Sequence, residues 1–380
     1  MILGIDATNI RSGGGVTHLV ELLSAAKPEK HGVAKVVVWG GKQTHEKLPN
    51  RPWLKKVNPY ASDVGLLRRT MWQRFNLSAV AYALKCDVLF VPGGSYAGTF
   101  RPIVTMSQNL LPFEWRELRR YGWSLTTLKF LLLRYTQSRS FQGADGVIFL
   151  TDYAKQAVLK VTGSINGKTA TIPHGLNSRF ESSPKVQQPI GAYTELNPYR
   201  LLYVSIIDQY KHQWHVVEAI HDLRKEGMPV VLDLVGPAYP AALKRLHGVI
   251  AQLDPEGKWV NYHGAVPYED LHRMYGQADL GIFASSCENM PNILLETMAA
   301  GLPIACSNRG PMPEVLGESG LYFDPENSDD LAQAIRTLLR NPELRHAKAQ
   351  TAFSRAQGYS WGRCGEQTFD FLVEVARGQG

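Results

Sequence analysis

The sequence predicts an α/β fold with two Rossmann-like, doubly wound domains. Short runs rich in β-branched residues alternate with segments of helical period along the 380 residues. The strand-like runs are continuously apolar, which is typical of a sheet covered by helices on both faces. The pattern occurs twice, on either side of residues 177–200, which are rich in Ser, Pro, Gln and Asn and carry no sustained period.

Five buried strands are expected before this linker and six after it. The first five are "MILGID", "AKVVVWG", "DVLFVPG", "RPIVTMS" and "DGVIFLT". The other six are "RLLYVSI", "PVVLDLVG", "WVNYHGAV", "DLGIFAS", "PIACSN" and "GLYFD". The helical segments between them are 16–26, 152–161, 214–226, 268–276, 291–300 and 328–340. Two such sheets facing each other would leave a cleft at the carboxyl ends of both sets of strands, where sheets of this type bind ligands.

The composition is that of an ordinary globular chain, with 44% hydrophobic and 20% charged residues. Four widely spaced cysteines match neither a C-x-x-C metal pattern nor a dense disulfide framework, so reduced cytosolic thiols are expected. The first residues do not resemble a secretory signal, and no apolar run approaches the ~20 residues that span a bilayer. We therefore expect a cytoplasmic protein that is not an integral membrane protein.

The net charge of +7 conceals opposite charges in the two halves of the chain. Residues 1–177 hold 23 Lys and Arg against 10 Asp and Glu, whereas residues 178–380 hold 18 against 24. A basic half suits nucleic acid, a phosphorylated ligand or an anionic membrane surface. Charge alone does not choose among these partners.

Two carboxylates, Glu288 and Glu296, flank the start of the predicted helix 291–300. Pro291 suits a first helical turn, and the free N–H groups of that turn favour an anion such as a diphosphate. Glu288 would lie at the mouth of this site. Glu296 lies further along among mostly apolar neighbours, so it needs hydrogen-bond donors such as the hydroxyls of a sugar or a ribose. The alternative to a ligand site is that Glu288 is an ordinary acid of a surface loop and Glu296 a helix acid that the helix dipole favours.

This region resembles the retaining glycosyltransferases of family 4, which have the GT-B fold. The signature of that family is E-x7-E followed by a stretch like "LLETMAAGLPIACSNRGPMPEVLG", and the likeness is specific in the C-terminal half. The resemblance implies an acceptor-side domain over residues 1–180 and a nucleotide-sugar-binding domain over residues 195–357. It also implies a C-terminal helix, within residues 358–380, that packs back on the first domain.

The resemblance assigns contacts with a sugar-nucleotide donor to this stretch. Glu288 corresponds to the family glutamate that contacts the sugar, and Glu296 to the one that contacts the ribose. Where the family has Phe-Gly after the first glutamate, this chain has "NMPN". The proline has no N–H, so the amides of Met290, Asn292 and Ile293 are the candidate donors to the sugar hydroxyls and the phosphate.

Lys211 follows the first strand of the second domain and precedes a helix, in "YVSIIDQYKHQWHVVEAI". The resemblance implies that it is the diphosphate-binding lysine, and we expect an exposed side chain that adds little to folding stability. The family commonly has an arginine five or six residues earlier, where this chain has Ile206 and Ser205. Neutralisation of a departing diphosphate would then rest on Lys211 and helix dipoles. The alternative is an ordinary solvated loop lysine.

Two loops of the first domain complete the predicted site. Gly14 and Gly15, in "NIRSGGGVTHLVELL", permit close backbone approach at a helix start, and the resemblance implies contact with donor phosphate or acceptor. The G-x-G-x-x-G pattern of dinucleotide sites is absent. Gln108 and Asn109, in "TMSQNLLPFE", stand where the family often has a His-Asp pair. Their amides can hydrogen-bond hydroxyls on the acceptor or sugar side but cannot act as bases.

Residues 114–142 mix cations with aromatic and aliphatic residues. This segment contains six basic residues against two acids, together with Trp115, Trp123 and the run Leu131–Leu133. Such helices can lie in a membrane interface and meet anionic headgroups. A core-packed helix with a solvated basic side is the alternative. The position in the acceptor-side domain favours peripheral contact with a membrane that carries a lipid-linked acceptor.

The resemblance thus implies a retaining glycosyltransferase of the hexosyltransferase type. The resemblance implies a nucleotide diphosphate sugar as donor and a glycan or lipid-linked acceptor, in synthesis of a cell-surface polysaccharide such as lipopolysaccharide. No cofactor or metal is expected, because the sequence offers no Asp-x-Asp motif or His/Cys cluster near the proposed site. Two alternatives remain: a nucleotide-sugar-binding protein without turnover, and a nucleic-acid-binding protein, although no recognised nucleic-acid module is present.

Overall fold

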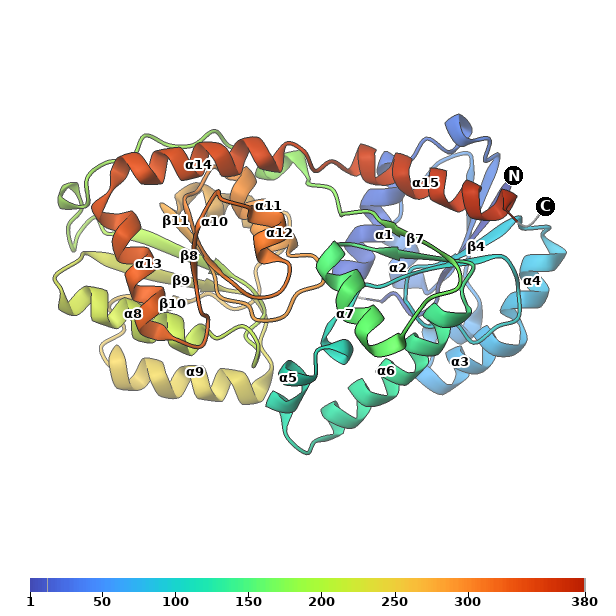
Figure 1. The fold of residues 1–380 in the computed structure, drawn as a ribbon, viewed down its shortest axis with the longest axis horizontal. Helices are drawn as coiled ribbons and strands as arrows, with labels where there is room; N and C mark the ends of the chain where they lie inside the picture. The colour runs from blue at the N-terminus through green and yellow to red at the C-terminus, as the bar shows by residue number, and fades with distance from the viewer. Residues whose placement is uncertain (12, 379–380) are drawn as a thin grey trace. The chain divides into compact units, whose positions relative to one another are not determined.

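Two parallel sheets, each in a unit of its own, organise the chain (Figure 1). The computed structural model describes residues 1–11 and 13–378. The first unit consists of Met1–Gly175 together with the chain from Tyr359 onwards, and the second is Leu176–Gly358. Both sheets carry helices, so the predicted α/β class with two Rossmann-like domains is confirmed. The first part of the first unit ends at Gly175, so the whole of the predicted linker, residues 177–200, belongs to the second unit.

The first sheet has seven parallel strands in the order β3-β2-β1-β4-β5-β6-β7. The strands are β1 (Ile2–Ala7), β2 (Lys35–Gly40), β3 (Leu54–Val57), β4 (Val88–Val91), β5 (Ile103–Met106), β6 (Gly146–Phe149) and β7 (Lys168–Thr171). The five predicted strands are present, and β3 and β7 are additional. These two are the edges of the sheet and read "LKKV" and "KTAT", so they lack the continuous apolar run of a buried strand.

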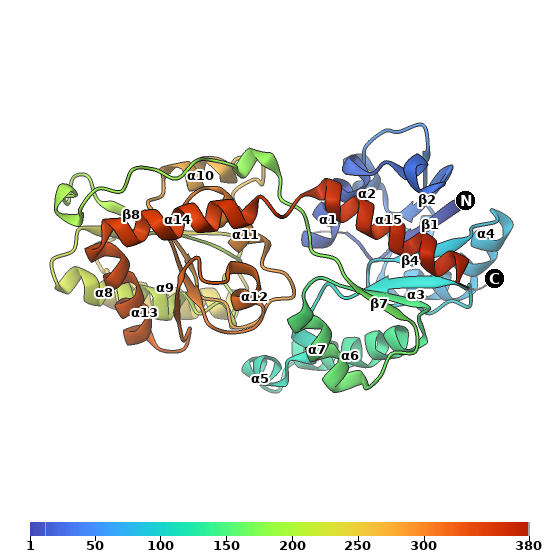
Figure 2. The same cartoon turned by 45° about the horizontal axis from the view of Figure 1, so that its top comes forward.

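The helices of the first unit connect these strands, and the final helix returns to cover the sheet (Figure 2). They are α1 (Gly14–Ala25), α2 (Lys42–Lys47), α3 (Leu66–Phe75), α4 (Leu77–Ala83), α5 (Trp115–Leu118), α6 (Leu125–Gly143), α7 (Asp152–Thr162) and α15 (Trp361–Arg377). Helix α15 packs on α1, β4 and β5, and its first turn is capped by the Ser360 hydroxyl, which accepts a hydrogen bond from the Arg363 amide. The basic segment 114–142 forms α5, a 3-10 turn (Arg119–Tyr121) and most of α6 rather than one helix.

Three rings meet where the chain leaves and re-enters the first unit. His18 of α1 is fully buried, with its ring centroid 4.6 Å from that of His174 and 5.6 Å from that of Trp361. Burial, and secondarily the charge of His174, hold the pKa of His18 well below its ordinary value. Gly175 lies against the backbone of Trp361, where a Cβ would collide at 2.1 Å. His18 and His174 are therefore packing residues.

The second sheet has six parallel strands in the order β10-β9-β8-β11-β12-β13. The strands are β8 (Tyr199–Val204), β9 (Val230–Val235), β10 (Val260–Tyr262), β11 (Leu280–Phe283), β12 (Ile304–Ser307) and β13 (Leu321–Phe323). All six were predicted. The chain proceeds outwards from β8 to β9 and β10 and then returns to β11 on the other side of β8. The direction of winding thus reverses between β8 and β11, which is where doubly wound sheets bind ligands.

Seven helices connect the strands of this unit or follow them. They are α8 (Gln213–Lys225), α9 (Pro240–Leu253), α10 (Leu271–Gln277), α11 (Asn292–Ala299), α12 (Met312–Leu316), α13 (Ser328–Arg340) and α14 (Pro342–Ala356). The predicted helix 291–300 is shorter, because Pro291 has non-helical angles (φ −82°, ψ 74°) and caps α11. Helix α13 is held at its start by the side chain of Asn327, which accepts hydrogen bonds from the amides of Asp329 and Asp330.

A fully buried arginine ties the linker to the end of α13. The Arg345 guanidinium donates to the carbonyls of Leu338 and Leu339, both at 2.7 Å, and so satisfies acceptors at the end of that helix. Its Nε donates to Gln187 Oε1 at 3.0 Å, and its Nη2 donates to the Gln188 carbonyl. One planar cation therefore joins α13, α14 and the linker through four hydrogen bonds.

Replacing Arg345 by Ala should lower the free energy of unfolding by about 3 kcal/mol, because buried acceptors lose their donors and the volume of the side chain is left empty. Urea unfolding of the whole protein measures the loss. Arg340→Ala is the matched control, because Arg340 is an exposed arginine of α13 that pairs only with Glu226 at 3.4 Å. Equal small losses for the two variants would contradict the anchoring role of Arg345.

Candidate functional site

The candidate site lies at the carboxyl ends of β8, β11 and β12. The loop after β8 carries Lys211, and the loop after β11 carries Glu288. These strands are neighbours in the sheet, and the winding direction reverses between the first two. The fold therefore brings together the two residues that sequence reasoning placed at the diphosphate and at the sugar.

Lys211 and Glu288 form an ion pair between these loops. Lys211 Nζ donates to Glu288 Oε1, and the two side chains are 7% and 16% exposed. The expectation of an exposed lysine was wrong, because Lys211 packs between rings: its Nζ lies 5.1 Å from the ring centroid of Tyr210 and 5.5 Å from that of Phe283. A charge in such a place needs its partner, so the pair couples the two loops electrostatically.

His212 fixes the backbone next to this pair. It is one of two non-glycine residues with positive φ in the described chain, at φ 52° and ψ 30°. His212 Nε2 lies 2.9 Å from Ser286 Oγ, and the Ser286 amide donates to the Tyr210 carbonyl at 2.8 Å. The left-handed turn is thus held by contacts with the opposite loop, and it directs the chain from Lys211 into α8. No sequence pattern identified this residue.

Glu296 is buried inside α11 with only 4% of the residue exposed. Tyr275 Oη, from α10, donates to Glu296 Oε2 at 3.1 Å. Burial raises the pKa of Glu296 to about 7, although hydrogen bonds from Tyr275 and Tyr268 and the charge of Arg179 act in the opposite direction. Sequence reasoning predicted a buried carboxylate that needs donors. It missed the tyrosine hydroxyls that supply some of them.

The other predicted donor contacts lie at the start of α11 and just before it. Met290 is buried, whereas Asn292 and Ile293 are half-buried. The Asn292 amide donates to the Met290 carbonyl at 3.0 Å, so this candidate amide already has a partner in the turn. The Ile293 carbonyl accepts a hydrogen bond from the Thr297 hydroxyl at 2.7 Å.

The loop after β12 also approaches Glu288, and sequence reasoning did not identify it. Arg309 follows β12, and its neighbour Gly310 lies close enough to Glu288 that a Cβ on the glycine would be 3.9 Å from the Glu288 amide nitrogen. Arg309 Nη2 pairs with Asp324 Oδ2 at 2.6 Å. Its buried Nε has no hydrogen-bond partner among the described residues. The backbone of this loop therefore lies beside Glu288, whereas the Arg309 guanidinium is held by the carboxylate of Asp324.

The predicted residues of the first unit form a separate group. Gly14 and Gly15 begin α1, and a Cβ placed on Gly15 would lie 3.0 Å from Gln108 Oε1. Asn109 Oδ1 accepts a hydrogen bond from the Leu111 amide at 3.1 Å and so supports the 3-10 turn Leu111–Phe113. The structure therefore brings Gly15 and Gln108 together, whereas Asn109 has a local structural partner.

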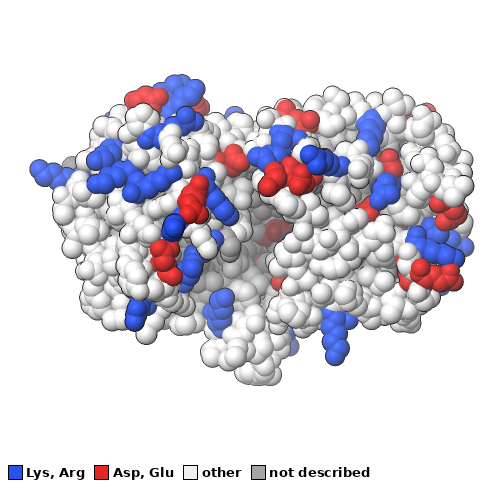
Figure 3. Space-filling model, turned by 180° about the vertical axis from the view of Figure 1, so that it is seen from behind, with Lys and Arg blue, Asp and Glu red and all other residues white. Residues whose placement is uncertain are grey.

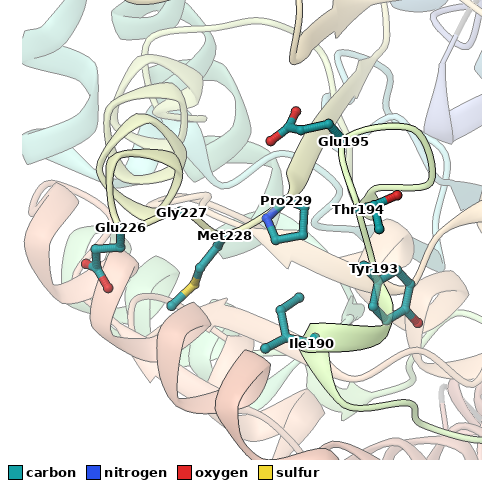
Figure 4. A pocket seen from close by; sticks show the side chains of 9 residues that line it. Ile190, Tyr193, Thr194, Glu195, Glu226, Gly227, Met228 and Pro229 are labelled. Atoms are coloured by element: carbon teal, nitrogen blue, oxygen red, sulfur yellow. The ribbon is translucent and has the colours of Figure 1, made fainter.

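A pocket of about 460 Å³ lies at the opposite end of the second sheet, before β8 and β9 (Figure 4). Ile190 and Met228 face into it, and Glu195 and Glu226 lie at its sides. Both carboxylates are paired, with Arg224 and with Arg336. No predicted site residue lines this pocket, so it contributes nothing to the candidate site. Across residues 1–11 and 13–378, no three His, Cys, Asp or Glu side chains come together in a group that could hold a metal ion.

Comparison with known proteins identifies the second unit. Residues 192–355 match the family described as glycosyl transferases group 1, and this range contains Lys211, Glu288 and Glu296. The likeness to this family therefore covers the unit that holds all three residues. The predicted family resemblance is confirmed.

Curated relatives carry the same resemblance over part of their length. The chain is 33% identical over 255 residues to O-antigen chain mannosyltransferase B of Escherichia coli, covering 63% of this chain and 64% of the relative. It is 24% identical over 238 residues to spore coat protein SA of Bacillus subtilis strain 168, covering 58% of this chain and 62% of the relative. The chain thus matches less than two thirds of the length of these relatives.

Solved structures share the fold over almost the whole chain. Sucrose-phosphate synthase from Thermosynechococcus elongatus has a TM-score of 0.77 at 18% identity and covers 100% of both chains. Anabaena HepE in complex with UDP and glucose has a TM-score of 0.70 at 18% identity, with coverage of 98% and 100%. WaaG, a glycosyltransferase involved in lipopolysaccharide biosynthesis, has a TM-score of 0.69 at 16% identity. The match covers 98% of this chain and 99% of WaaG. The GT-B fold is therefore confirmed.

The Lys211–Glu288 pair should appear as a coupling free energy in a double-mutant cycle. Lys211→Met and Glu288→Gln should each cost about 3 kcal/mol of unfolding free energy, because each removes one partner of a largely buried pair. The double variant should lose less than the sum of the single losses, by about 1–3 kcal/mol. Urea unfolding of the four proteins gives the cycle.

The matched control for this cycle is the exposed pair of Arg273 and Asp270, whose side chains are 71% and 41% exposed and 3.3 Å apart. Its coupling should be under about 1 kcal/mol. A coupling at Lys211 and Glu288 no larger than that of the control pair would contradict the buried pair.

Glu296 should make stability depend on pH. Its folded pKa of about 7 lies above its ordinary value of 4.5, so the folded protein binds the extra proton between these values, and stability falls as pH rises through that window. Relative to Glu296→Gln, the wild type should lose about 3 kcal/mol between about pH 4 and about pH 8. Urea unfolding at both pH values measures this difference. Glu343→Gln, at an exposed acid of α14, is the control, and parallel pH profiles for wild type and Glu296→Gln would refute the raised pKa.

Proposed function

We propose that this protein transfers a glycosyl group from a nucleotide diphosphate sugar to an acceptor hydroxyl with retention of configuration and without a metal ion. The observation that carries the proposal is the pair Glu288 and Glu296 inside a glycosyl transferases group 1 domain, with Lys211 held against the first carboxylate. Two carboxylates and a lysine at the switch point of a doubly wound sheet suit a ligand that has hydroxyls at both ends and negative charge between them.

The nucleotide half of the donor would bind first to α11. In this proposal Glu296 accepts hydrogen bonds from ribose hydroxyls, as a buried carboxylate with Tyr275 on one oxygen retains acceptor capacity. The diphosphate would lie towards Lys211, where the N-terminal turn of α11 adds a favourable dipole.

The diphosphate and Glu288 would compete for the Lys211 ammonium. The donor phosphate would take over part of the positive charge that Glu288 now holds, and the released carboxylate would be free to accept hydrogen bonds from the sugar hydroxyls. Binding would thus convert a paired carboxylate into a sugar contact. Lys211 would stabilise the charge that develops on the leaving diphosphate, a contribution of roughly 3–4 kcal/mol in the transition state for a well-placed donor.

The transfer step balances without an enzymic base. The bond between the anomeric carbon and the phosphate oxygen breaks, and the acceptor oxygen forms a new bond to that carbon on the same face. The acceptor proton passes to the departing diphosphate oxygen. Gln108 and Asn109 can position hydroxyls through hydrogen bonds, and neither has to accept or donate a proton in this step.

The relatives favour a hexose donor and a cell-surface acceptor. One sequence relative is named as an O-antigen chain mannosyltransferase, and one solved structure with the same fold is a glycosyltransferase involved in lipopolysaccharide biosynthesis. We infer a glycan or lipid-linked acceptor in polysaccharide synthesis, and a cytoplasmic enzyme that works peripherally on the inner face of the membrane. A nucleotide-sugar-binding protein without turnover would bind the same donors and release no nucleotide. Binding to DNA or RNA without sugar-nucleotide binding would favour a nucleic-acid function instead.

A donor screen tests the proposal directly. The purified protein is mixed with UDP- and GDP-hexoses, in the presence and absence of EDTA and with membrane lipid extract as acceptor source, and release of nucleoside diphosphate is measured. Release with one donor that persists in EDTA supports the proposal, and NMR of the product gives the anomeric configuration. Donor binding without release of nucleoside diphosphate would refute glycosyl transfer, and inversion at the anomeric carbon would refute retention.

The two glutamates should separate by ligand. Glu296→Gln should weaken free nucleoside diphosphate and whole donor alike, because both carry the ribose. Glu288→Gln should lose roughly 1.5–3 kcal/mol of binding or transition-state energy with the whole donor, which is the range for a hydrogen bond to a charged group. It should not weaken the free nucleotide, because it removes the carboxylate that competes with the diphosphate for Lys211. Calorimetric titration of each variant with the nucleotide and with the sugar nucleotide makes the comparison. Equal losses for both ligands in Glu288→Gln would refute the assigned roles.

A further inference from the structure

Helices α3 and α6 expose apolar side chains along one side each. On α3, Leu67, Met71 and Phe75 recur every four residues and are 75%, 51% and 66% exposed. On α6, Leu128 and Leu132 are 64% and 63% exposed, and Leu125, Leu131 and Tyr135 continue the same side. Helices of a globular unit normally turn such a stripe towards the core. We call these two exposed stripes the α3–α6 surface.

Both helices pack on one loop, so the stripes belong to the same region of the first unit. Gln73 of α3 donates to the Ser95 carbonyl at 3.3 Å, and Gln137 of α6 lies so close to Gly94 that a Cβ there would be 2.8 Å from its Nε2. Ser140 of α6 accepts a hydrogen bond from the Tyr96 amide at 2.9 Å. Figures 1 and 2 both show the two helices next to each other.

The exposed stripes face away from this loop. Gln73 and Gln137 are buried, at 3% and 4% exposed. At about 100° per residue, Phe75 lies roughly 160° around α3 from Gln73, and Leu128 lies roughly 180° around α6 from Gln137. The apolar side chains therefore point outwards because the polar glutamines hold the inner faces. The arrangement is the reverse of an ordinary amphipathic core helix.

The charges of the α3–α6 surface have one sign. Helix α3 carries Arg68, Arg69 and Arg74, helix α6 carries Lys129, Arg134 and Arg139, and neither helix contains an aspartate or glutamate. Trp123, in the turn before α6, is fully exposed, and Trp115 of α5 is 52% exposed. Figure 3 shows more Lys and Arg than Asp and Glu on the visible face of the first unit. Apolar, aromatic and basic side chains without carboxylates are the composition of a helix that lies in an anionic bilayer interface.

We propose that the α3–α6 surface docks the protein on an anionic bilayer, with both helices lying in the headgroup region and their leucines and Phe75 entering the acyl boundary. Exposed apolar patches of this kind mark interaction sites. A second copy of the chain would bring six cations against six, which disfavours self-association through this face. No helix in the described part of the chain is long and apolar enough to cross the bilayer, so the contact is peripheral.

Membrane docking through this surface would bring the enzyme to a lipid-linked acceptor. This role for the surface rests on the proposed function. Helix α6 packs on the 3-10 turn Leu111–Phe113, which directly follows Gln108 and Asn109. The ring centroid of Phe113 lies 5.9 Å from that of Phe141 on α6. A bilayer held at α6 would therefore lie near the loop assigned to the acceptor side. The segment 114–142 contains only half of the surface, because α3 precedes it by forty residues of sequence.

Vesicle sedimentation tests the surface. Full-length protein is spun with vesicles of phosphatidylcholine alone or mixed with an equal part of phosphatidylglycerol. Wild type should bind the mixed vesicles, and binding should fall as salt is raised. The variant Leu67→Ser/Phe75→Ser/Leu128→Ser/Leu132→Ser should bind the mixed vesicles roughly tenfold or more weakly. Its four positions are exposed, so it should fold as the wild type does, which thermal unfolding checks.

Matched controls separate the surface from general stickiness. Val186→Ser/Leu196→Ser removes apolar side chains that are 81% and 99% exposed on the second unit, and it should bind vesicles as wild type does. Arg68→Gln/Arg74→Gln/Lys129→Gln/Arg139→Gln should weaken binding only where phosphatidylglycerol is present. Lys225→Gln/Lys258→Gln, which neutralises exposed lysines of the second unit, is its control.

Three outcomes would overturn the proposal: wild type that binds no vesicles, an apolar variant that binds as well as wild type, or a wild-type dimer that the apolar variant abolishes in sedimentation velocity. The last result would assign the surface to a second copy of the chain. Nucleoside diphosphate affinity, measured by calorimetry, should be unchanged in the apolar variant. Vesicle binding with no transfer from any donor would refute the proposed function and leave the docking surface standing.

Discussion

The ion pair of Lys211 and Glu288 is the interaction on which the candidate site depends. It joins the loops after β8 and β11, the two strands between which the second sheet reverses its winding. Each charge is largely removed from water, so loss of either partner would leave a costly unpaired charge at this junction. His212 and Ser286 secure the same junction by backbone and side-chain contacts. The geometry of the site is therefore set by a contact that the proposed donor would partly replace.

Glu296 shows the opposing demands of stability and function. Burial raises the pKa of its carboxyl group to about 7, so the folded protein holds this group at an energetic disadvantage near neutral pH. A glutamine would remove that cost and would also remove the carboxylate that the proposal assigns to the ribose. The cost arises because the carboxylate is buried, and the tyrosine hydroxyls that reach it do not fully offset its loss of water. Such strained ionisable groups are found most often where a ligand completes their hydrogen bonding.

Much of this organisation could be predicted from the sequence, because the signals were local. Continuous apolar runs predicted all the central strands, and Pro291 predicted the start of the helix that carries Glu296. The edge strands "LKKV" and "KTAT" lack such runs, so they were missed. The burial of Lys211, the left-handed turn at His212 and the approach of the loop after β12 to Glu288 depend on contacts between distant segments. Arg345 and the exposed face of α3 depend on tertiary packing in the same way, and neither could be identified from composition.

The most direct test of the central claim is a crystal structure of the protein with a nucleotide diphosphate sugar. We expect ribose hydroxyls about 3 Å from the Glu296 carboxylate and the diphosphate at Lys211 Nζ. We expect the sugar hydroxyls at a Glu288 carboxylate that has given up part of its contact with the lysine. A donor bound away from these three residues, for example in the pocket between Ile190 and Met228 at the opposite end of the sheet, would contradict it.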